Sequence, residues 1–73
     1  MQLLEFVTVS ADMVRQMVKN VEKKVAREGA VHVEPSYVNE YGWLVFECFD
    51  PADRRVGMYM ISPDGLGEYH PLY

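Results

Sequence analysis

The sequence 37-YVNEYGWLVFECFDP-51 places five aromatic residues and the only cysteine of the chain close together. Residues 43–49 are rich in aromatic and aliphatic side chains, which predicts a strand. Because side chains alternate between the two faces of a strand, one face carries Leu44, Phe46 and Cys48. The other face carries Trp43, Val45, Glu47 and Phe49. Which of these faces lies under a helix decides which residues form the core.

Regular patterns on both sides of this strand predict an α+β fold. Before it we expect a strand at 2–9, a helix at about 11–28 and a strand from 30 toward 38. After it we expect a strand at 55–62. The order is therefore β-α-β-β-β, with one amphipathic helix packed on a four-stranded, mostly antiparallel sheet in a single small domain, residues 1–73.

Three short motifs predict the connections between the later strands. NEYG (39–42) and DPADR (50–54) are typical of hairpin turns, and SPDG (62–65) has proline at the second and glycine at the fourth turn position. The tail 66–73 is expected to form a C-terminal strap or a short edge strand, because Pro71 limits its pairing.

The helix prediction follows from a repeated apolar stripe. The spacing i, i+3, i+4, i+7 and i+11 is met by Val14, Met17, Val18, Val21 and Val25. Ser10 is expected to cap the N-terminus and Gly29 to end the helix in a left-handed conformation.

A single helix covers only one face of a four-stranded sheet. We expect it to cover Phe46 and its neighbours, because a carboxylate such as Glu47 under the helix would be costly to bury. Trp43, Val45 and Phe49 would then lie on the open face with nothing in this chain to cover them. Exposed apolar patches of this kind mark interaction surfaces.

Charge is unevenly distributed along the chain, which has a net charge of −4. Residues 11–28 carry five Lys/Arg against three Asp/Glu, whereas residues 29–73 carry two against seven. Either the charges are ordinary solvated surface, or the acidic and aromatic half meets a basic partner and gains association rate from charge complementarity.

The pattern of reactive residues argues against catalysis, and we expect no enzyme activity, metal or cofactor. His32 and Glu34 share a strand face but supply too few ligands for a metal. Cys48 is expected to be a buried apolar residue rather than a nucleophile. Nucleic acid is an unfavoured partner, since acids surround the aromatic residues and the helix offers few cations.

No signal peptide or membrane span is recognisable, so we expect a cytoplasmic protein. In size and acidity the chain resembles the short single-domain proteins with which phages and mobile elements block host enzymes, anti-CRISPR proteins and DNA mimics among them. That resemblance implies a small viral inhibitor that acts in the host cytoplasm.

Together these observations predict a non-enzymatic protein-binding module, an inhibitor or adaptor that occludes a partner's basic surface. The expected contact residues are Tyr37, Glu40, Tyr41, Trp43, Glu47, Tyr59, Tyr69 and Tyr73. Tyrosine and tryptophan are frequent at the energetic centres of interfaces. Two alternatives remain open: a homodimer that is structural or encloses a small ligand, and a weak nucleic-acid binder that uses the basic helix.

Overall fold

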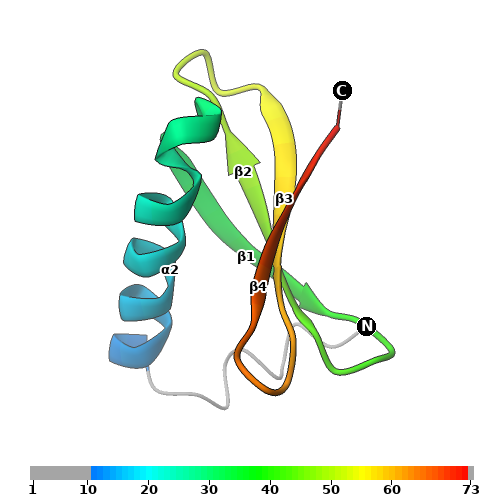
Figure 1. Ribbon diagram of the computed structural model, residues 1–73. Coiled ribbons are helices and arrows are strands. Elements are labelled where there is room, and N and C mark those ends of the chain that lie inside the picture. The colour runs from blue at the N-terminus through cyan, green and yellow to red at the C-terminus, as the bar shows by residue number, and fades with distance from the viewer. Residues whose placement is uncertain (1–10, 73) are drawn as a thin grey trace.

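The computed structural model describes residues 11–72 and confirms the α+β class. The described part of the chain forms one helix followed by a four-stranded antiparallel sheet (Figure 1). The strand predicted at 2–9, the expected cap at Ser10 and the contact residue Tyr73 lie outside the described residues.

Helix α2 (Ala11–Val25) continues into a short 3-10 turn, η1 (Ala26–Glu28). The predicted stripe is its inner face: Val21 and Val25 are fully buried, and Met17 and Val18 pack against the core. Gly29 ends the helix as predicted, with φ of 86° and its amide donating to the carbonyl oxygen of Ala26 at 3.1 Å.

The four strands follow one another in chain order across the sheet. Each strand pairs antiparallel with the next, and their bounds are β1 (His32–Val38), β2 (Leu44–Phe49), β3 (Arg55–Ile61) and β4 (Gly67–Pro71). The sheet is therefore a meander, which the short predicted connections require.

All three predicted turns are present and are closed by backbone hydrogen bonds. Gly42 donates to Asn39, Asp53 to Asp50, and Gly65 to Ser62, at 2.9–3.0 Å. Side chains reinforce all three, because a side-chain oxygen can accept from backbone amides within its own turn, as Ser62 Oγ does from the amide of Leu66 at 3.2 Å. Asn39 Oδ1 accepts from the amides of Tyr41 and Trp43, and Asp50 Oδ1 from those of Ala52 and Arg54.

The C-terminal tail forms a short edge strand, which was one of the two predicted alternatives, and not a strap. Residues Gly67–Pro71 pair in register with Gly57–Ile61, so they form a regular edge strand. Pro71 does not prevent this pairing, because it stands at the end of the strand, where the amide that proline lacks is not needed to bond β3.

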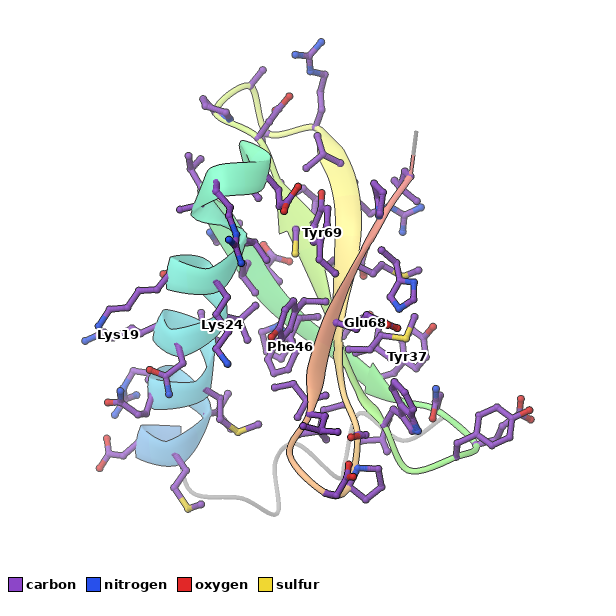
Figure 2. All side chains as sticks on the ribbon, viewed as in Figure 1. Lys19, Lys24, Tyr37, Phe46, Glu68 and Tyr69 are labelled. Carbon is purple, nitrogen blue, oxygen red and sulfur yellow. The ribbon has the colours of Figure 1, made fainter. Side chains whose placement is uncertain are left out.

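The core lies between α2 and one face of the sheet, and Figure 2 shows Phe46 between them. Phe46 and Cys48 have no exposed surface, and Val33 and Tyr59 are 2% and 6% exposed. The prediction that the helix covers the face of β2 with Leu44, Phe46 and Cys48 is confirmed.

Candidate interaction surface

The sheet face opposite α2 is not covered by any other element in residues 11–72, and we call it the helix-free face (Figure 1). Strand register places its side chains in three rows that cross the sheet. The rows are Tyr37–Val45–Met60–Glu68, Glu34–Glu47–Met58–His70 and His32–Phe49–Arg55. Aromatic, thioether and charged groups therefore alternate over this face.

Glu47 lies near the middle of the helix-free face and has two partners. It accepts a hydrogen bond from the Ser36 hydroxyl at 2.8 Å and an ion-pair contact from Arg55 at 3.0 Å. Ser36 reaches it from a bulge in β1, where the register with β2 shifts between Pro35 and Tyr37. The Ser36 hydrogen bond, followed by that of Arg55, lowers the pKa of Glu47, so this carboxylate is charged at neutral pH.

Two histidine–glutamate pairs stand on the outer strands of the same face. His32 and Glu34 of β1 approach to 2.8 Å, as do His70 and Glu68 of β4, and all four side chains are largely solvent-accessible. With neutral histidines, the face carries three carboxylates against the one guanidinium of Arg55. The helix-free face is therefore acidic at neutral pH.

The apolar side chains of this face are more deeply buried than the sequence predicted. The expectation that Val45 lies uncovered is wrong: it has no exposed surface, because it sits in the middle of a row with Tyr37 and Met60 on either side. Trp43 and Phe49 are half-buried. What the face offers to a partner is a set of partly exposed aromatic and methionine side chains rather than a bare hydrophobic patch.

Trp43 borders an open groove of ≈ 460 Å³ at the end of the sheet. Its other lining residues are Ser62, Asp64, Leu66, Gly67 and Glu68. The groove thus combines the only tryptophan of the chain with a 70% exposed leucine and two carboxylates. Such a site suits a partner side chain that has an apolar stem and a cationic end.

The opposite side of the molecule has the opposite charge. Exposed cations on α2 and η1 are Arg15, Lys19, Lys23, Lys24 and Arg27, of which Arg15 pairs with Asp12. Figure 2 shows Lys19 and Lys24 on the helix, and Tyr37 and Glu68 on the far side of the sheet. The charge split along the sequence is therefore also a split between two surfaces.

The structure separates the seven predicted contact residues that it describes. Tyr37, Trp43 and Glu47 lie together on the helix-free face, and Glu40 and Tyr41 are exposed in the β1–β2 turn, with Tyr41 74% exposed. Tyr59 and Tyr69 do not belong to this face. They pair with each other on the helix side, where Tyr59 is buried and Tyr69 packs against the core.

Several residues of the helix-free face were absent from the predicted set. These are Glu34, Ser36, Arg55, Met58, Met60, Glu68 and His70. The alternation of Met58 and Met60 around Tyr59 was visible in the sequence and put the two methionines on one face. Assigning that face needed the β2–β3 register, in which Tyr59 stands opposite Phe46.

The structure describes the environment of the single cysteine and of the candidate metal ligands. Cys48 is fully buried, and desolvation raises the pKa of its thiol to about 11, which keeps it protonated. Within residues 11–72 no group of three His, Cys, Asp or Glu side chains is arranged to hold a metal ion. No helix in this range has the length and apolar character needed to cross a membrane.

Comparison of the chain with protein-family models, with curated proteins and with solved structures gives no match.

Proposed function

We propose that the protein is a non-enzymatic binding module that docks its helix-free face onto a basic surface of another protein, as an inhibitor or adaptor. The observation that carries the proposal is the composition of this face. Partly exposed aromatic and methionine side chains lie there among Glu34, Glu47 and Glu68, and no other layer of the described chain covers them.

Each kind of group on the face has a distinct part in binding. The carboxylates attract Lys and Arg of the partner, which raises the association rate and fixes orientation. Tyr37 and Trp43 supply contact area with little conformational entropy to lose, and Met58 and Met60 adapt to the partner's shape. The mechanism is occlusion, in which the partner's cationic surface becomes inaccessible to its usual ligand.

The test uses two variants that make the same charge change on opposite sides of the molecule. Glu34→Lys alters an exposed carboxylate of the helix-free face, and Glu28→Lys alters an exposed carboxylate of η1. The parent and both variants serve as bait in nuclease-treated lysate of the source or host cell. A partner captured by the parent and by Glu28→Lys but lost by Glu34→Lys supports the proposal. Equal capture by all three baits, or no captured protein, contradicts it.

A further inference from the structure

We propose that the edge of β4 with which no other strand of residues 11–72 pairs is a self-association site, at which two copies of the chain join their sheets in antiparallel fashion about a two-fold axis at Tyr69. The observation behind the proposal is a self-complementary order of side chains and backbone groups along residues 66–72. The interface lies at the edge of the sheet, where it includes Glu68 and His70 at the border of the helix-free face.

The backbone of β4 presents a regular row of groups to this edge. Toward β3, the amide of Leu72 donates to Val56 and the carbonyl of Leu66 accepts from Ser62. Along an antiparallel strand, every second residue directs its backbone amide and carbonyl toward a given neighbour. The even-numbered residues of β4 therefore make the hydrogen bonds to β3. Gly67 and Tyr69 then direct both amide and carbonyl outward, and Pro71 directs its carbonyl outward with no amide to leave unsatisfied.

Placing the axis at Tyr69 matches these groups to a second copy. The amide and carbonyl of Tyr69 bond those of the second Tyr69, and each Gly67 amide reaches the carbonyl of the other Pro71. Only the amide that proline lacks is missing from the ladder. Moving the axis to residue 70 would bring Tyr69 opposite Pro71, and residues 67–71 would then make half as many of these hydrogen bonds.

Side chains of the helix-free face select the same register. With the axis at Tyr69, Glu68 stands opposite His70 of the second copy, which is a favourable cross-strand pair. An axis at residue 68 would make as many backbone bonds, but it would set Glu68 directly opposite its own copy. Like charges in that position are destabilising.

The same register also brings together the two apolar side chains that flank β4. Leu66 is 70% exposed and Leu72 is 40% exposed, and both are among the few large hydrophobic residues on the described surface. The Tyr69-centred pairing sets Leu66 opposite Leu72 of the second copy on each side of the axis. Leucines that are exposed among the described residues thus become buried contacts.

The other edge of the sheet lacks this property. β1 carries Pro35 in its middle and a bulge at Ser36, and both features interrupt a row of outward backbone groups. Proline and bulges are the usual means by which edge strands avoid pairing with another chain. β4 has its proline only at the last position.

Engineered disulfides test the register directly. In the proposed dimer residues 68 and 70 form a non-hydrogen-bonded pair, whose Cα separation of roughly 4.5 Å suits a disulfide. Under mild oxidation, a mixture of Glu68→Cys and His70→Cys proteins should yield covalent dimer at roughly fivefold the level of either protein alone. The reason is that residue 68 stands directly opposite residue 70 of the second copy, whereas it lies only diagonally from residue 68 of the second copy. The buried Cys48 stays reduced.

The chain provides a matched control on the other edge. His32 and Glu34 of β1 repeat the spacing and exposure of the β4 pair, and a mixture of His32→Cys and Glu34→Cys should give no such excess. In the unmodified protein, exchange of the Gly67 and Tyr69 amides should slow as concentration rises. Equal dimer in all mixtures, or amide exchange that does not change with concentration, would overturn the proposal.

Discussion

The ring of Tyr69 lies directly over Gly57 of the neighbouring strand. A Cβ added to Gly57 would come within 2.5 Å of the tyrosine hydroxyl oxygen, which itself donates to the carbonyl of Val56 at 3.3 Å. The relationship is reciprocal, because the ring of Tyr59 covers Gly67 on β4 in the same way. Two tyrosines that face each other across β3 and β4 thus each shield a glycine, and they complete the part of the core beyond the helix.

Gly57→Ala is therefore expected to destabilise the protein. The new methyl group has to displace the Tyr69 ring, and overpacking of this kind costs about 1–3 kcal/mol. Urea unfolding followed by Trp43 fluorescence measures the loss. In a double-mutant cycle, Gly57→Ala should cost much less in a Tyr69→Ala background. Strictly additive free energies of unfolding would show that the ring is not the group that excludes a side chain at residue 57.

The helix and the strands were predictable because each follows from local pattern. The valine stripe fixes α2, Gly29 fixes its end, and Asn39, Asp50 and Ser62 begin turns that their own backbones close. The strand character of residues 67–71 was harder to recognise, because Gly67 and Pro71 both reduce strand propensity. Gly67 is tolerated there because the Tyr59 ring covers it, and that contact joins residues on different strands.

The interaction surface was only partly predictable, because the register of the strands decides on which face a side chain lies. Tyr59 and Tyr69 have the residue type of interface anchors, yet the register turns them toward the helix. That register includes shifts at Ser36 and next to Phe49, where one strand contains an extra residue. A bulge moves every later side chain to the other face, and the two shifts could be placed only once the strand pairing was known.

Glu47 should make stability depend on pH in the acid range. Its pKa in the folded state is lowered, chiefly by the Ser36 hydrogen bond and then by Arg55. Because the pKa of Glu47 is lower in the folded state, its contribution to the free energy of unfolding is fully present above the pKa of the unfolded state, near 4.5. That contribution is lost as the pH falls through the pKa of the folded state. Glu47→Gln should lose about 1 kcal/mol at pH 7 and show a weaker dependence below pH 4.5.

Urea titrations of the parent and of Glu47→Gln between neutral and acidic pH measure this effect. Glu40→Gln is the control, because Glu40 is an exposed carboxylate of the β1–β2 turn. An acid dependence that is the same in the parent and in Glu47→Gln would contradict the assignment of the hydrogen bonds to the charged carboxylate.

Cys48 should be inert in the native protein. Its thiol is fully buried and its pKa is raised to about 11, so the reactive thiolate is scarce at neutral pH and reagents cannot reach it. A thiol-specific reagent should label it only in denaturant, with one equivalent per chain. Rapid labelling without denaturant would mean that the contact between α2 and the sheet opens easily.

Trp43 should report the negative charge of the helix-free face. It shares its groove with Asp64 and Glu68, so caesium ions should quench its fluorescence more efficiently than iodide, relative to free N-acetyltryptophanamide. Since the chain has one tryptophan, the signal is unambiguous. Glu68→Gln should reduce the difference between the two quenchers, and stronger quenching by iodide would contradict an acidic surface around Trp43.

The most direct test of the account is the affinity of the captured partner for the parent, Glu34→Lys and Glu28→Lys proteins, measured at low and at high salt. We expect Glu34→Lys to weaken binding by roughly tenfold or more, mainly through a slower association rate, since bringing like charges together costs several kcal/mol. Glu28→Lys, on the opposite side of the molecule, should bind as the parent does, and salt should weaken the parent complex. A partner that loses affinity for Glu28→Lys and keeps it for Glu34→Lys would place the binding surface on the helix and contradict the proposed function.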